Sequence, residues 1–147
     1  MSATGGNNEV HFLLERHDKN SAALSDVPGL TDQIEAGCSY VFEATIWFSA
    51  SELGGSKWAI GGTAQADRVI WCGQILNENN EEILPIYPKH DLGETHEDGR
   101  SRIGFLKIWG FVKAATTGTL AVQFAQQQPS EISSVLPGSH FIVKPAS

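Results

Sequence analysis

The sequence predicts an all-β fold, an antiparallel β-sandwich or jelly roll of about eight to nine strands. Three observations predict it. Short apolar runs follow one another between turn signals, at intervals close to the roughly 8–12 residues expected of sandwiches and barrels. The runs are rich in aromatic and β-branched residues, which favour strands. No segment shows a long helical period, so helices are not expected to cover the sheets.

The clearest strand runs from Cys38 to Ser49, because its side chains alternate between two faces. The apolar face carries Tyr40, Phe42, Ala44, Ile46 and Phe48, and the other face carries Glu43, Thr45 and Ser49. Such alternation is typical of a strand with one face in the core.

Further strands are expected at 9–16, 58–60, 67–76, 83–88, 101–114, 119–127, 131–138 and 139–147. Pro85 predicts an edge strand or a bulge, because proline cannot donate a ladder hydrogen bond. The segment from Lys107 to Gln128 is interpreted as two strands joined by a Thr-Thr-Gly turn, with Leu120, Val122 and Phe124 facing the core. One helical turn is expected near Thr31 to Glu35.

Length and charge limit the organisation of the chain. At 147 residues we expect a flexible N-terminal arm over 1–8 and a single jelly-roll domain over 9–147. The net charge is −7, and the 10 basic residues are scattered, which argues against nucleic acid as a partner. The chain begins without a signal-peptide pattern and has no apolar stretch near 20 residues, so we expect a cytoplasmic protein with no membrane partner.

Cysteines and histidines raise two questions about bound metal or redox chemistry. Cys38 and Cys72 show no metal-ligand spacing; plain thiols are favoured, and their pairing stays open. The segment 88–100 contains six potential ligands, but they lack the alternation of a rigid site, and we interpret the segment as a solvated acidic loop without metal. These are His90, Asp91, Glu94, His96, Glu97 and Asp98.

No motif indicates catalysis, so we predict that the protein is not an enzyme and has no cofactor. A G-x-S-x-G elbow is missing, and Ser139 and His140 are adjacent, which points them to opposite faces of a strand. The tryptophans Trp58, Trp71 and Trp109 are interpreted as core residues, whereas Trp47 shares a face with polar residues and is expected at the surface. A carbohydrate-binding module stays an alternative, because aromatic rings stack on sugars.

The region from about residue 30 to 144 resembles a family of bacteriophage virion proteins with a jelly-roll fold. The elements that carry the resemblance are Gly110, the run Gly118-Thr119-Leu120, the pair Ala125-Gln126 and the pair Gly138-Ser139. The segment "IEAGCSYVFEATIWFSAS" is similar to the earlier half of that family. Related domains occur in head decoration proteins, tail fibres and tail tips.

The resemblance implies a non-enzymatic homotrimer in the virion, assembled in the host cytoplasm. A short domain without a shaft favours a capsid decoration, or cement, protein whose partner is the major capsid protein or another virion protein; a tail fibre, tail tip or adaptor component is the alternative. Small, amide and aromatic side chains outside the core are expected to form the subunit interface. These are Phe105, Trp109, Phe111, Ala121, Gln123 and Ala125.

Overall fold

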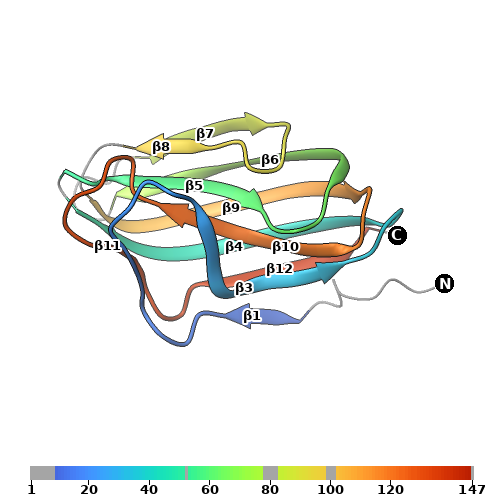
Figure 1. Cartoon of the computed structure of the whole chain (residues 1–147), viewed down its shortest axis with the longest axis horizontal. Helices are drawn as coiled ribbons and strands as arrows, with labels where there is room; N and C mark the ends of the chain where they lie inside the picture. Colours follow the sequence, from blue (N-terminus) through green and yellow to red (C-terminus); the bar gives the residue numbers. More distant parts are fainter. Residues whose placement is uncertain (1–8, 52, 78–82, 99–101, 147) are drawn as a thin grey trace.

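The structure is a computed structural model that describes residues 9–51, 53–77, 83–98 and 102–146. Every regular element in these ranges is a β-strand, and the strands form two antiparallel sheets packed face to face (Figure 1). The predicted all-β sandwich is therefore confirmed. The predicted arm, residues 1–8, lies outside the described ranges.

The larger sheet, here called sheet A, has six strands along its main path and two at one side. In spatial order the six are β1 (Val10–Phe12), β12 (His140–Pro145), β4 (Ser39–Ala50), β9 (Arg102–Ala114), β6 (Ala66–Asn77) and β7 (Ile83–Lys89). In addition β11 (Ser133–Val135) pairs with β4, and β2 (His17–Lys19) pairs with β11. The smaller sheet, sheet B, has the order β3 (Ser25–Ile34), β10 (Gly118–Ala125), β5 (Ser56–Gly61) and β8 (His96–Asp98).

The strand order is that of a jelly roll with one added hairpin. If β2, β11 and the β6–β7 pair are set aside, eight strands remain in chain order. The first, eighth, third and sixth of these form one sheet, and the second, seventh, fourth and fifth form the other. This double Greek key defines the jelly roll. The β6–β7 pair widens sheet A beyond β9.

The core lies between the two sheets and is built from alternate residues of each strand. The apolar face predicted for β4 is confirmed, since all five of its members are buried. Leu120, Val122 and Phe124 of β10 contribute from sheet B, as predicted. Trp58 and Trp71 are fully buried, one from each sheet, so the core interpretation is confirmed for these two tryptophans.

The helical turn expected near Thr31 to Glu35 is wrong, because residues up to Ile34 belong to β3. Val27, Leu30 and Ile34 face the core at spacings of three and four residues, which imitates a helical period. The pairing of β10 with β3 shifts register between Ala121 and Gln123, so a β-bulge changes the spacing.

Three strands were not expected, which brings the number in the described ranges to twelve. They are β2, β3 and β8, and β8 lies inside the segment that was interpreted as a charged loop. The prediction for Pro85 is confirmed, because β7 is the last strand of sheet A and leaves one side unpaired.

The strands β9 and β10 do not pair, although they are separated by only three residues. They belong to different sheets, so the Thr-Thr-Gly segment crosses from one layer of the sandwich to the other (Figure 1). The crossing is held by backbone hydrogen bonds from Ala115 and Thr116 to the Gln65 carbonyl. The two predicted strands joined by this segment are therefore confirmed, but they do not form a hairpin.

Candidate functional site

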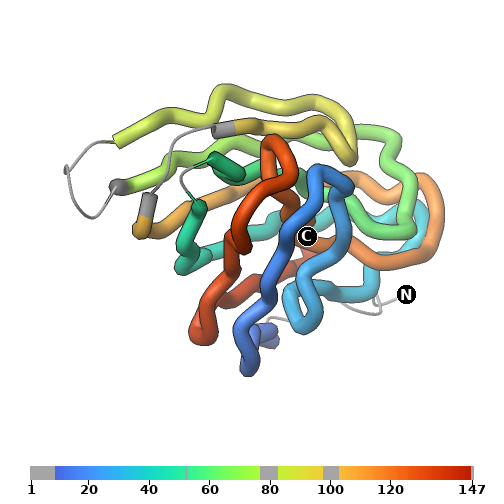
Figure 2. The backbone as a smooth tube through the Cα atoms, turned by 60° about the vertical axis from the view of Figure 1, so that its left-hand side comes forward, coloured from blue at the N-terminus to red at the C-terminus, as the bar shows by residue number. Residues whose placement is uncertain are grey.

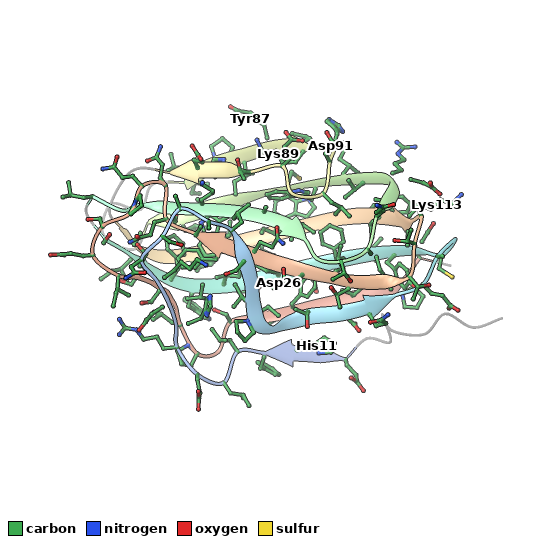
Figure 3. All side chains as sticks on the ribbon, in the orientation of Figure 1. His11, Asp26, Tyr87, Lys89, Asp91 and Lys113 are labelled. Carbon is green, nitrogen blue, oxygen red and sulfur yellow. The ribbon has the colours of Figure 1, made fainter. Side chains whose placement is uncertain are left out.

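Exposed hydrophobic side chains are concentrated on the outer face of sheet A. Eleven large hydrophobic residues in the described ranges are exposed, and eight of them point outward from this sheet. We call this surface the apolar face; its exposed members are Val10, Phe12, Val41, Trp47, Ile83, Tyr87, Ile103 and Trp109. Sheet A extends from β1, which carries His11, to β7, which carries Tyr87 (Figure 3), and the apolar face has members on both of these strands.

Cross-strand register places the side chains of the apolar face in rows. One row crosses β12, β4, β9 and β6 and consists of Ile142, Glu43, Trp109 and Cys72. The next row crosses the same strands and consists of Lys144, Val41, Phe111 and Ile70. Side chains directly opposite each other on one face of a sheet lie about 5 Å apart at their Cβ atoms, so each row forms a continuous ridge.

A groove of about 470 Å³ lies between these two ridges. Its lining is mainly apolar; Glu43 and Lys144 contribute the charged groups, and Trp71, Cys72 and Trp109 also carry polar side-chain atoms. Gly110 lies in the groove floor, and a Cβ there would come within 2.6 Å of Phe42 Cζ and 2.7 Å of Trp71 Cβ. The missing side chain thus lets two core aromatic residues pack beneath the groove.

The apolar face also carries positive charge, although the protein as a whole is acidic. Arg68, Lys107, Lys113 and Lys144 are exposed at its outward positions on β6, β9 and β12. The acidic residues at paired outward positions are Glu43 on β4 and Asp18 on β2, and Asp18 forms an ion pair with Arg16. Electrostatic complementarity at such a surface favours an acidic partner. The face is therefore suited to a partner that presents both apolar and acidic groups.

The outer face of sheet B is different, because its polar groups are satisfied within the chain. Gln123 Nε2 donates to Asp26 Oδ1 at 2.9 Å. Lys57 Nζ lies 3.5 Å from Glu97 Oε1 and also donates to the Ala22 carbonyl. None of the eleven exposed hydrophobic residues lies on this face. Sheet B thus presents a polar surface typical of contact with water.

The structure divides the six residues predicted for the subunit interface between the two faces. Phe105, Trp109 and Phe111 lie on the apolar face of sheet A. Ala121, Gln123 and Ala125 lie on the outer face of sheet B, on the opposite side of the sandwich from the apolar face. The prediction that all six residues form one continuous surface is therefore wrong. Ala121 and Ala125 also have 0% exposure in the single chain.

Two of the four tryptophans are exposed. Trp47 is 44% exposed, as expected, and its ring centroid lies 4.9 Å from that of Phe105. Trp109 is 43% exposed, so its interpretation as a core residue is wrong, whereas its position outside the core, expected from the alternation along its strand, is confirmed. β9 belongs to sheet A, with Ile108 facing the core and Trp109 facing outward.

The potential ligand residues of segment 88–100, interpreted from the sequence as a solvated acidic loop, do not converge in the described part of the chain. No three His, Cys, Asp or Glu side chains there lie close enough to hold a metal ion. The Glu94 carboxylate accepts a hydrogen bond from the His90 backbone N–H at 2.9 Å, and Glu97 lies beside Lys57. These carboxylates therefore stabilise the loop and β8. Cys38 and Cys72 are both free and partly buried.

Ser139 has a structural role. Its hydroxyl donates to the Leu136 carbonyl at 2.8 Å and accepts from the Trp47 backbone N–H at 2.9 Å. The side chain of His140 lies instead on the outer face, 5.6 Å from the Phe12 ring. The two residues therefore do not form a nucleophile and base pair.

Of the groove lining, sequence reasoning predicted only Trp109 and Phe111 as site residues. The residues that it missed include Val41, Ile70, Cys72 and Ile142. The available signal was that β6 is apolar at outward as well as inward positions. Comparison with known proteins identifies no relative: no family profile matches the chain, and no curated protein is significantly similar to it. No helix in the described ranges is long and apolar enough to cross a membrane.

Proposed function

We propose that this chain is a non-enzymatic structural protein of a bacteriophage virion, a homotrimer that binds the outer capsid surface as a decoration, or cement, protein. The observation that carries the proposal is the apolar face, where eight of eleven exposed large hydrophobic residues lie on one side of one sheet. Monomeric soluble proteins rarely expose contiguous apolar patches larger than a few hundred Å². Such a face is therefore expected to be covered in the assembled particle.

The strand order gives independent support. Jelly rolls occur in viral capsid proteins, in lectins and in cupins, so the fold agrees with a virion role without selecting it. The resemblance of residues 30 to 144 to phage virion proteins favours the first of these classes. Assembly takes place in the host cytoplasm, and the partners are further copies of the chain and the major capsid protein.

Burial of the apolar face supplies the free energy of assembly. Removing apolar surface from water contributes roughly 25 cal/mol per Å². The ridges on either side of the groove, with Trp109 and Phe111 at their centre, provide the largest share, because aromatic side chains dominate interface energetics. The polar outer face of sheet B stays in water.

The test uses particles from which the protein has been removed. The wild-type protein is expected to rebind these capsids and to raise their resistance to heat, whereas Trp109→Asp binds much more weakly. Thr31→Asp, on the outer face of sheet B, is the matched control and binds like wild type. Failure of the wild-type protein to bind depleted capsids excludes the cement function. Localisation of the tagged protein at the tail supports the tail fibre, tail tip or adaptor alternative.

A carbohydrate-binding module is the second candidate, because Trp47 and Trp109 are exposed on a jelly-roll sheet. Sugar hydroxyl groups need hydrogen-bond partners when they are buried. The lining of the groove beside Trp109 is mainly apolar, with charged groups only from Glu43 and Lys144, which favours an apolar occupant. Titration with host glycans tests this candidate: quenching of tryptophan fluorescence that is lost in Trp109→Ser supports a sugar site.

A further inference from the structure

Two loops at one end of the sandwich are joined by a buried glutamine. Gln126 is fully buried, and its side-chain oxygen accepts a hydrogen bond from the Ser130 backbone N–H at 3.1 Å. Its side-chain nitrogen donates to the Glu131 carbonyl and lies 3.2 Å from Ser133 Oγ. The glutamine thereby fixes the loop that connects β10 with β11.

The same network holds the loop after β4. Gln127 N–H donates to the Gly54 carbonyl at 2.8 Å, and Ser133 Oγ donates to the Gly55 carbonyl at 2.9 Å. The Gln126 amide occupies the space beside Gly54, since a Cβ at Gly54 would come within 2.3 Å of Gln126 Nε2. The two loops therefore form one unit, and they lie side by side in Figures 1 and 2.

This unit presents exposed apolar side chains from a rigid support. Leu53 is 66% exposed and Ile132 is 50% exposed, and both belong to the three exposed hydrophobic residues that lie outside the apolar face. The exposed Glu131 precedes Ile132 and adds a negative charge. We call Leu53, Glu131 and Ile132 the tip. Loops that are ordered before binding lose less conformational entropy when they bind.

The tip and the groove have matching chemistry. The tip is apolar and acidic, whereas the groove is apolar and is bordered by Glu43 and Lys144, and the further cations Lys113 and Arg68 are exposed on the apolar face. The two surfaces cannot meet within one molecule. Val41 lines the groove near the start of β4, and Ala50 ends β4 just before the tip, so nine residues of extended strand separate them by about 30 Å.

Pairing of two apolar faces with each other is electrostatically unfavourable. At the paired outward positions of β12, β4, β9 and β6, each face carries four cationic residues, Arg68, Lys107, Lys113 and Lys144, and one carboxylate, Glu43. The Asp18 carboxylate on β2, at one side of the sheet, is paired with Arg16. Like charges brought together at an interface oppose association. The occupant that fits the groove in both charge and polarity is the tip of a second copy.

We infer that copies of this chain associate head to tail, with the tip of one copy seated in the groove of the next. This inference rests on the proposed homo-oligomeric function and specifies its interface. Contacts of this kind are heterologous, and they close into a ring when the rotation between successive copies is suitable, which for three copies is a trimer. Every subunit then contributes one groove and one tip.

Mixing two defective variants tests the inference directly. Trp109→Asp disables the groove and leaves the tip intact, whereas Ile132→Asp disables the tip and leaves the groove intact. Each variant alone is expected to be monomeric by size-exclusion chromatography with light scattering at micromolar concentration. A mixture is expected to form a dimer with one copy of each variant, because one intact contact remains and the two free surfaces are both disabled.

Val41→Asp and Leu53→Asp form a second pair of variants for the same experiment. Circular dichroism is used to check that each variant is folded. Thr31→Asp, outside both surfaces, is the control and keeps the wild-type oligomer. Two separate monomers in the mixture overturn the inference, as does a monomeric wild-type protein. An Ile132→Asp variant that stays oligomeric while Trp109→Asp is monomeric also overturns it and indicates face-to-face pairing. A dimer in the mixture from a protein that does not bind capsids supports the head-to-tail contact and excludes only the cement function.

Discussion

Gln123 on β10 donates a hydrogen bond to Asp26 on β3, with 2.9 Å between Nε2 and Oδ1, and the two strands are neighbours in sheet B. The Gln123 side chain also lies over Gly61 of β5, where a Cβ would come within 2.4 Å of Gln123 Oε1. Its polar group is thus used within the chain. The outward Gln123 side chain of β10 therefore packs on its own sheet.

Replacement of Gln123 with alanine is expected to change stability slightly and oligomeric state not at all. The hydrogen bond to Asp26 is exposed. Its loss costs about 1 kcal/mol of the free energy of unfolding, measured by urea denaturation. Asp26→Ala completes a double-mutant cycle that isolates the pair. Dissociation of the oligomer in Gln123→Ala would contradict this prediction and would indicate that Gln123 belongs to a subunit interface.

A glutamate at Ala125 is expected to destabilise the fold. Ala125 has 0% exposure and pairs with Lys57 in the β10–β5 ladder, so a longer charged side chain has no space without displacing its neighbours. Overpacking of this kind costs roughly 1–3 kcal/mol, and a buried charge adds to the cost. The midpoint of urea unfolding is the measurement. Gln127→Glu, two residues further on and exposed, is the control and keeps wild-type stability. A folded, dissociated Ala125→Glu variant with an unchanged midpoint contradicts this prediction.

Alternation along single strands predicted which side chains face the core. On β4 the buried set from Tyr40 to Phe48 follows from a period of two. The same reasoning failed on β3, because the bulge between Val27 and Leu30 gives these residues a helical spacing. A bulge depends on the partner strand, and the sequence of β3 alone does not contain that information.

Alternation also failed to place the candidate site. It assigns Trp109 and Ala125 correctly to positions that point away from the core, but it does not say which sheet each strand joins. β9 and β10 are separated by a crossing between the sheets, so their outward faces point in opposite directions. The groove depends in turn on the register of four strands, two of which are far from the others in sequence.

Removal of the Gln126 side chain is expected to loosen the tip. In Gln126→Ala the Ser130 backbone N–H and the Glu131 carbonyl lose their partner. Leaving buried polar groups unsatisfied costs about 1–3 kcal/mol. Hydrogen exchange should increase in residues 127–133 and 53–55, because both loops depend on this amide, and Gln127→Ala serves as the control. Unchanged protection of these loops in Gln126→Ala contradicts the role of the glutamine as their common support.

A methyl group at Gly110 is expected to destabilise the protein through the core beneath the groove. The Cβ of Gly110→Ala meets Phe42 Cζ, Trp71 Cβ and the Ile70 carbonyl oxygen at 2.5–2.7 Å. Relief of these contacts requires movement of packed core residues, at a cost of roughly 1–3 kcal/mol. Thermal unfolding measures the change. Gly93→Ala is unsuitable as a control because its φ is +83°, so Ala115→Gly, at an exposed position, is used instead. Wild-type stability of Gly110→Ala would show that the sheet adjusts without strain.

The stability of the fold is expected to decrease as the pH falls below about 6.5, in part because of His17. Burial lowers the pKa of this imidazole, the nearby Lys19 lowers it further, and Asp18 opposes the shift. The ring packs edge-on against Phe124, with centroids 6.4 Å apart. Within the described ranges its Nε2 is buried without a hydrogen-bond partner, so the folded state favours the neutral ring.

Below a pH of about 6.5 the unfolded chain takes up this proton more readily than the folded protein, so the free energy of unfolding falls until the pH lies below the folded pKa. His17→Phe removes this contribution and keeps an aromatic ring against Phe124. Urea denaturation of both proteins at several pH values between about 8 and 5 measures the effect, because this interval brackets the ordinary histidine pKa of 6.5. The variant is expected to lose less stability over this interval than the wild type, because titration of the carboxylates affects both equally. Identical pH dependence in the two proteins would assign the acid sensitivity to groups other than His17.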